Sequence, residues 1–245
     1  MHKPLEPLPR TIIPDSLGIL GGMGPLASAE FLKTVYEMNV DECEQTAPIC
    51  ILASDPTFPD RTQAVLDGDN EAIVSHLEQW LSRLLQQGCS RVVVTCITAH
   101  HFLQKISPTL RADVISLVDV LFEELIGTDQ RHLLLCTNGT RASKILQRDV
   151  RWPQVASSIV LLDEEDQAKT HDLIYQIKIN EVRSCPEKFL GHLAEKYAVE
   201  SFVAGCTEVH LLNKRVTGGG QKDCPYRFVD PLMKLARDYR SMVYE

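Results

Sequence analysis

Short apolar, β-branched runs alternate along this chain with longer segments in which apolar residues recur at three- and four-residue steps. This alternation predicts an α/β fold, a parallel sheet covered by helices. The expected strands are Leu17–Leu20, Ile49–Ala53, Arg91–Thr95, Val114–Leu117, Leu133–Cys136, Ile159–Leu162 and Ser201–Ala204. The expected helices include Leu26–Met38, Asn70–Gln87, Ala142–Gln147, Glu164–Ile179 and Pro186–Lys196.

The chain also contains a short internal sequence repeat, called the echo below. RVVVTCITAHHFL and VESFVAGCTEVHLL each run an apolar strand into a cysteine, followed by a threonine within two residues and a histidine four residues on. The echo predicts two similar α/β halves, with Cys96 and Cys206 each at the carboxyl end of a strand. Ligands bind at that edge of open α/β sheets. Coincidence between two buried cysteines is the alternative, because cysteine is common in cores.

Two cysteines at such positions suggest acid and base chemistry. A thiol beside a helix N-terminus is biased toward thiolate by the helix dipole. A thiolate on one side of a cavity and a thiol on the other could remove a proton from one face of a carbon and return one to the opposite face. The two groups must differ in protonation, because neighbouring thiolates repel and one proton is needed for donation.

Composition excludes several other classes of function. The 245 residues carry a net charge of −8 without a basic cluster, so a nucleic-acid partner is not expected, and a small molecule is favoured. No apolar run approaches the ~20 residues that cross a bilayer, and the first residues lack a signal-peptide core, so we expect a cytoplasmic protein and no membrane partner. The eight scattered cysteines indicate reduced thiols and not a disulfide scaffold.

A glycine-rich segment follows the first expected strand and opens a helix with Pro25. Its glycines would let backbone amides approach an anion at the helix end. Gly22, Gly24 and Ala27 also satisfy the dinucleotide pattern GxGxxA. Two features count against a dinucleotide: Pro25 removes an amide donor, and Asp55 follows too late for the usual ribose contact.

Zinc is a further alternative. Cys96 and His100, like Cys206 and His210, have the i, i+4 spacing that places two ligands on one helical face. A cysteine still on the strand would not share that face. We therefore interpret His100, His101 and His210 mainly as packing or hydrogen-bonding residues.

Other polar residues lie at the same sheet edge. Arg61, in a turn after the second strand, could hold a carboxylate through two hydrogen bonds, or could be an exposed loop charge. Thr137 and Thr140, after the strand ending at Cys136, could donate hydroxyls to an anion or cap a helix.

Together these segments resemble the aspartate/glutamate racemase family of cofactor-independent amino-acid racemases. The matching pieces are GILGGMGPLAS at 18–28, FPDRT at 58–62, TCITAH at 95–100, LLLCTNGT at 133–140 and AGCTEVHLL at 204–212. They span most of the chain and leave out the first 16 residues. One departure is Ile97, where the family usually has Asn after the first catalytic cysteine.

The resemblance implies two pseudo-symmetric α/β domains with mainly parallel sheets, an active site in the cleft between them, and commonly a homodimer. We expect residues 1–112 and 222–245 in the first domain and 113–221 in the second. Cys96 and Cys206 would be the two acid/base thiols. Substrate contacts would fall on Met23, Gly24, Arg61, Thr98, Thr137, Thr140, Thr207 and, by a looser match, Lys178. Glu208 would orient or polarise the site.

These observations lead to one functional hypothesis and two alternatives. The first is racemisation of an acidic amino acid, with aspartate favoured, requiring no cofactor and no metal. The second is a related isomerase or decarboxylase acting on a small dicarboxylate or a hydantoin. The third is a small-ligand-binding protein without catalysis.

Overall fold

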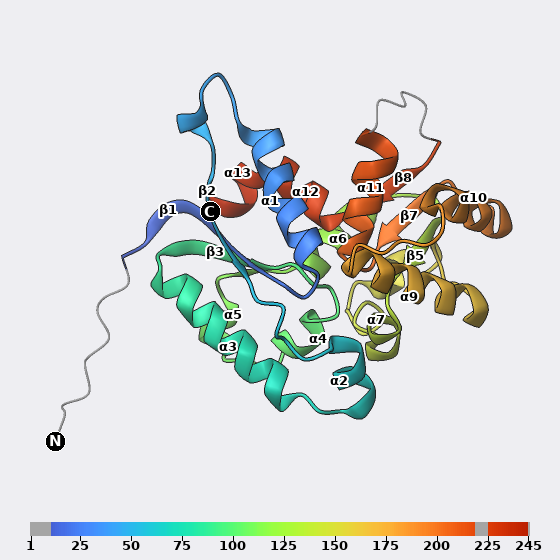
Figure 1. Ribbon diagram of the computed structural model, residues 1–245, viewed down its shortest axis with the longest axis horizontal. Coiled ribbons are helices and arrows are strands. Elements are labelled where there is room, and N and C mark those ends of the chain that lie inside the picture. The colour runs from blue at the N-terminus through green and yellow to red at the C-terminus, as the bar shows by residue number, and fades with distance from the viewer. Residues whose placement is uncertain (1–10, 219–224, 245) are drawn as a thin grey trace.

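A computed structural model of the protein describes residues 11–218 and 225–244, and within them the chain forms two α/β halves (Figure 1). The strands are β1 (Ile13–Gly21), β2 (Ile49–Ser54), β3 (Cys89–Val94), β4 (Val114–Ile115), β5 (His132–Leu135), β6 (Ile159–Val160), β7 (Ser201–Ala204) and β8 (Arg227–Val229). The helices are α1 (Pro25–Asn39), α2 (Arg61–Asp67), α3 (Glu71–Gln86), α4 (His100–Leu103), α5 (Pro108–Arg111), α6 (Leu117–Leu125), α7 (Asn138–Ser143), α8 (Trp152–Val155), α9 (Glu164–Lys178), α10 (Pro186–Tyr197), α11 (Glu208–Gly218), α12 (Pro231–Arg237) and α13 (Tyr239–Val243), with a 3₁₀ turn, η1, at Glu44–Thr46.

The two sheets share one topology. The first has the order β2-β1-β3-β4 and the second the order β6-β5-β7-β8, with every pair parallel. The α/β class and the seven expected strands are confirmed. The eighth, β8, was not expected, because three residues are too few to show an alternating pattern. The third strand in each order, β3 or β7, leads into Cys96 or Cys206.

Strand pairing extends both sheets beyond the expected domain boundaries. The first sheet continues past residue 112 to β4, and the second continues past residue 221 to β8. After Val229 the chain returns to the first half, where α12 packs on α1 and α13 on β1 (Figure 1). Tyr239 fixes this return by donating its hydroxyl to the Asp15 carbonyl at 3.0 Å.

Two helices differ from the expected elements. The helix expected over Ala142–Gln147 instead occupies Asn138–Ser143, because the Thr137 hydroxyl accepts from the Thr140 N–H and starts the helix earlier. The turn expected around Arg61 is the start of α2. Its N-cap is Asp60, whose carboxylate accepts from the Gln63 N–H.

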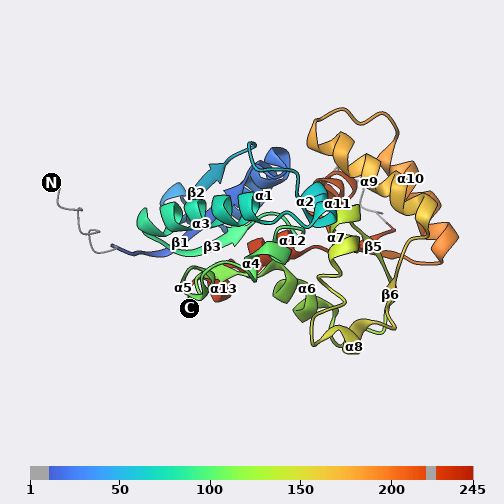
Figure 2. The ribbon, with the colours of Figure 1, turned by 90° about the horizontal axis from the view of Figure 1, so that it is seen from below.

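Alternation along the central strands divides the core between the sheet faces. In β1, Leu17 and Ile19 pack with Phe31 and Val35 of α1, whereas Leu20 belongs to the cluster on the α3 face. The cluster on the α1 face also contains residues of the second half, such as Val203, so one apolar core runs between the halves. Figure 2 shows the two halves side by side, with α12 near their junction. In the described part of the chain, no helix has the length and apolar character to cross a membrane.

Candidate active site

The two echoed cysteines occupy equivalent turns. Cys96 follows β3 and Cys206 follows β7, and both side chains are buried, at 5% and 4% exposure. Each carbonyl accepts from the amide three residues on: Ala99 donates to Cys96 at 3.2 Å, and Val209 to Cys206 at 3.0 Å. The sequence echo therefore corresponds to a repeated backbone turn at the carboxyl edge of each sheet.

Cys206 lies against a buried carboxylate. Its Sγ donates to Oε2 of Glu208 at 2.8 Å, and Glu208 is only 1% exposed. Burial, and then the Glu208 charge, raise the pKa of the Cys206 thiol well above its usual range. Cys206 therefore holds its proton at neutral pH and presents it to Glu208.

The glycine loop of the first half meets this carboxylate. A Cβ on Gly24 would lie 1.8 Å from Glu208 Oε1, so any larger residue there would displace the Glu208 carboxylate. Gly22 has φ of 90°, and a Cβ there would lie 2.2 Å from the Asp55 backbone. Glu208 Oε1 has no hydrogen-bond partner within the described residues, which leaves one buried acceptor facing the site.

Lys178, at the end of α9, is a cation whose pKa responds to the charges of both thiols. Burial lowers its pKa, but the charge of Glu208, and that of Cys206 and Cys96 when either thiol is ionised, outweighs that effect and raises the pKa. Its Nζ lies 4.5 Å from the centre of the Tyr175 ring. The side chain whose family match was loosest is thus a cation that interacts with both cysteines.

Arg61 is buried, at 8% exposure, so the exposed-charge interpretation was wrong. Its guanidinium donates to the carbonyls of Met23 at 2.7 Å and Pro59 at 2.9 Å, and at 3.3 Å to Phe58. These bonds tie the start of α2 to the glycine loop. The buried Nε has no partner among the described residues and remains an available donor.

Threonine hydroxyls from both halves form a small cluster. Thr98 Oγ1 lies 2.8 Å from Thr140 Oγ1 and 3.2 Å from Thr137 Oγ1. All three side chains are buried. The Thr207 hydroxyl donates to the carbonyl of Thr95, the residue before Cys96, at 3.1 Å. Each turn is therefore bonded to the opposite half.

The histidines after the cysteines do not converge on a common site. His100 Nε2 accepts from the Leu117 N–H at 3.0 Å, so Nδ1 carries the hydrogen and donates to the Cys96 carbonyl at 2.9 Å. His210 instead bonds Asp230 at 2.7 Å and Thr34 at 3.0 Å. The Cys96/His100 and Cys206/His210 pairs thus do not assemble a zinc site, and within the described residues no three potential metal ligands cluster.

One contact between the halves was not anticipated from the sequence. The Tyr175 hydroxyl donates to Asp60 Oδ2 at 2.7 Å, joining α9 to the N-cap of α2. Asp60 carries a local signal, an acidic residue preceding a helix. Tyr175 carries none, because it becomes recognisable only when α9 is placed against α2.

The scan of family models matches the chain over residues 20–234 to the Asp/Glu/Hydantoin racemase family. Among solved structures, an aspartate racemase from Picrophilus torridus has a TM-score of 0.76 and 21% identity, covering 93% of this chain and 94% of that one. A glutamate racemase from Campylobacter jejuni has a TM-score of 0.62 and 17% identity, covering 92% and 84%. At these identities the two structures establish the shared fold, and the family match establishes that this chain belongs to the Asp/Glu/Hydantoin racemase family.

Proposed function

We propose that the protein racemises an acidic amino acid, aspartate before glutamate, by a two-thiol mechanism that needs no pyridoxal phosphate. The observation that carries this proposal is that Cys96 and Cys206 occupy equivalent buried turns at the carboxyl edges of the two sheets, and the charge of either thiolate raises the pKa of Lys178. The likeness to an aspartate racemase over nearly the whole chain supports aspartate as the first substrate to test.

The hydrogen bond from Cys206 to Glu208 suggests how the two thiols begin a turnover. The Cys96 thiolate takes the α-hydrogen of the bound amino acid as a proton, and the electron pair of the C–H bond stays on the α-carbon. Cys206 then gives its Sγ proton to the opposite face of that carbon. Turnover leaves Cys96 as thiol and Cys206 as thiolate, the state that accepts the opposite enantiomer.

The α-proton of an amino acid is a weak acid, so the carbanion must be stabilised by groups that are already in place. In this proposal Lys178 and the buried Arg61 supply positive charge, and the hydroxyls of Thr98, Thr137 and Thr140 supply donors. The same cations favour a substrate with a second carboxylate. Glu208 would raise the cost of a thiolate at Cys206 and so keep the two sulfurs in different protonation states.

The decisive experiment incubates the purified protein with L-aspartate in deuterium oxide, without added cofactor. Formation of D-aspartate carrying α-deuterium, measured by chiral chromatography and mass spectrometry, is the expected result. Repeating the assay with both enantiomers of glutamate and with a hydantoin would identify the preferred substrate. Release of carbon dioxide without D-aspartate would replace the proposal with a decarboxylase, and no exchange with any of these compounds would replace it with a binding protein.

The homodimer implied by the family resemblance is part of the proposal. Sedimentation analysis of the protein at micromolar concentration tests it, and a monomer there would contradict it.

A further inference from the structure

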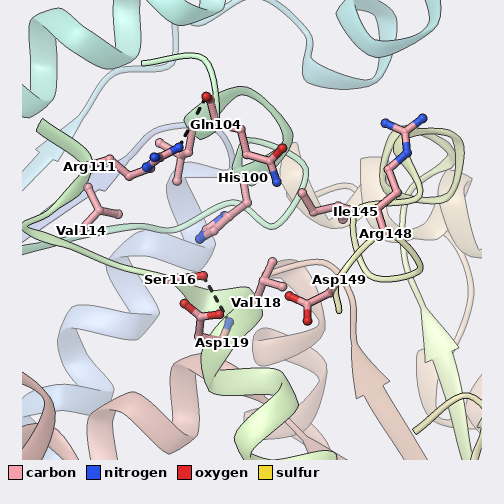
Figure 3. A pocket seen from close by; sticks show the side chains of 11 residues that line it. His100, Gln104, Arg111, Val114, Ser116, Val118, Asp119, Ile145, Arg148 and Asp149 are labelled. Carbon is pink, nitrogen blue, oxygen red and sulfur yellow. Dashed lines mark hydrogen bonds between the residues drawn. The ribbon is translucent and has the colours of Figure 1, made fainter. Parts of the chain in front are cut away.

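A cavity of about 350 Å³ lies between the two halves and is lined by neither Cys96 nor Cys206 (Figure 3). The first half contributes α4, α5, β4 and the start of α6, and the second half contributes the segment that follows α7. This volume is at the lower end of the range for small-ligand pockets. The cavity is thus separate from the proposed thiol site and suits a small molecule.

The charged side chains that line this cavity are two carboxylates and two arginines. Its two carboxylates, Asp119 and Asp149, are both bonded to the guanidinium of Arg151, at 2.7 Å in the case of Asp149. Arg111 and Arg148 also line it, and within the described residues neither lies within ion-pair distance of a carboxylate. One guanidinium nitrogen of Arg111 donates to the Gln104 carbonyl at 3.4 Å. Its other donors, like those of Arg148, suit carboxylates, which arginine holds through two parallel hydrogen bonds.

The wall between the two arginines combines polar side chains, such as Gln104 and Ser116, with a smaller number of apolar ones. Figure 3 shows Arg111 and Arg148 on opposite sides of the cavity, with Val114, Val118 and Ile145 among the labelled residues that line it. Leu103 adds to this apolar surface. The two opposed arginines suit a ligand with an acidic group at each end.

We infer that this cavity binds a small α,ω-dicarboxylate, one carboxylate pairing with Arg111 of the first half and the other with Arg148 of the second. Such a ligand would bridge the halves at a second place. One wall of the cavity is His100, which bonds both the Cys96 carbonyl and the Leu117 amide. Binding here is therefore adjacent to the turn of one proposed catalytic thiol, although the inference itself does not depend on the reaction.

Isothermal titration of the full-length protein with adipate and with suberate tests the inference. We expect saturable binding that weakens at least about tenfold in Arg111→Ala and in Arg148→Ala. Arg183→Ala, which removes an exposed arginine outside the cavity, should leave the dissociation constant within about twofold. Octanoate, with a single carboxylate, should bind at least about tenfold more weakly than suberate.

Both arginines of the cavity are exposed, so their alanine variants should retain the melting temperature of the unliganded protein. Binding that is unchanged in either variant would overturn the inference and place the dicarboxylate elsewhere, such as the thiol site. No measurable binding at about 10 mM ligand would also overturn it. Neither result bears on deuterium exchange into aspartate, which tests the proposed function separately.

Discussion

The turns around Cys96 and Cys206 have the same backbone bonds but different side-chain surroundings. Cys206 donates to Glu208 at 2.8 Å, whereas in the described part of the chain no carboxylate accepts from Cys96. His100 folds back onto the Cys96 carbonyl, while the corresponding His210 turns away to Asp230. A repeated turn can thus place two chemically identical groups symmetrically, while neighbours that are not repeated give them different hydrogen-bond partners.

The largest expected effect comes from removing either thiol. Cys96→Ala and Cys206→Ala should each lower racemisation in both directions by at least about 10³-fold, because every inversion needs one base and one acid. The remaining thiol can still exchange the α-hydrogen of the enantiomer that faces it. Deuterium uptake without inversion should therefore favour opposite enantiomers in the two variants.

The exposed Cys185 provides the control for this pair, and Cys185→Ala should keep full activity. Wild-type racemisation by either Ala variant would contradict the two-thiol mechanism. Uptake that favours the same enantiomer in both variants would contradict the opposed arrangement of the thiols.

The two histidines should differ in their contribution to folding. His210→Ala leaves the carboxylate of Asp230, which is 2% exposed, without its imidazole partner, and we expect a loss of about 3 kcal/mol in the free energy of unfolding. His100→Ala removes two hydrogen bonds of an uncharged ring and should cost about 2 kcal/mol. Urea denaturation of both variants measures the difference. A larger loss for His100→Ala would show that the Asp230 pair is not the more important contact.

Glu208 has a natural matched control in Glu187, which accepts from the exposed Cys185 at 3.0 Å with the same two-residue spacing. Glu208→Gln should lower kcat by about 10- to 100-fold, and Glu187→Gln should not change it. Glu208 raises the pKa of Cys206, so its removal lowers that pKa, and the alkaline limb of the pH–rate profile should move to lower pH. If the alkaline limb did not move, Glu208 would not control the ionisation of Cys206.

The smallest effect is expected at the surface contact between the halves. Tyr175→Phe deletes the hydroxyl that donates to Asp60 but keeps the ring beneath Lys178. We expect a loss of about 1 kcal/mol in stability, as is usual for one hydrogen bond, and a change in KM larger than that in kcat. Thermal denaturation and steady-state kinetics test this, and a kcat reduced more than KM is changed would assign the hydroxyl to the chemical step.

Much of the fold could be read from local patterns. Hydrophobic periodicity predicted seven of the described strands, and the echo around the cysteines predicted two similar α/β halves. The structure shows that these halves share one sheet order. The short strand β8 and the early start of α7 were missed, because the first depends on pairing with β7 and the second on one hydroxyl cap.

The sequence alone determined the α/β class, the repeated cysteine turns and the family, because these follow from periodicity and from motifs carried by consecutive residues. Only the tertiary structure decided which partners each cysteine has. Glu208 meets the glycine loop, Arg61 binds the Met23 carbonyl, and Lys178 at the end of α9 has a pKa that the charges of Glu208 and both cysteines raise. These contacts join residues far apart along the chain, and the proton affinity of a buried group depends on such neighbours and not on its own local sequence.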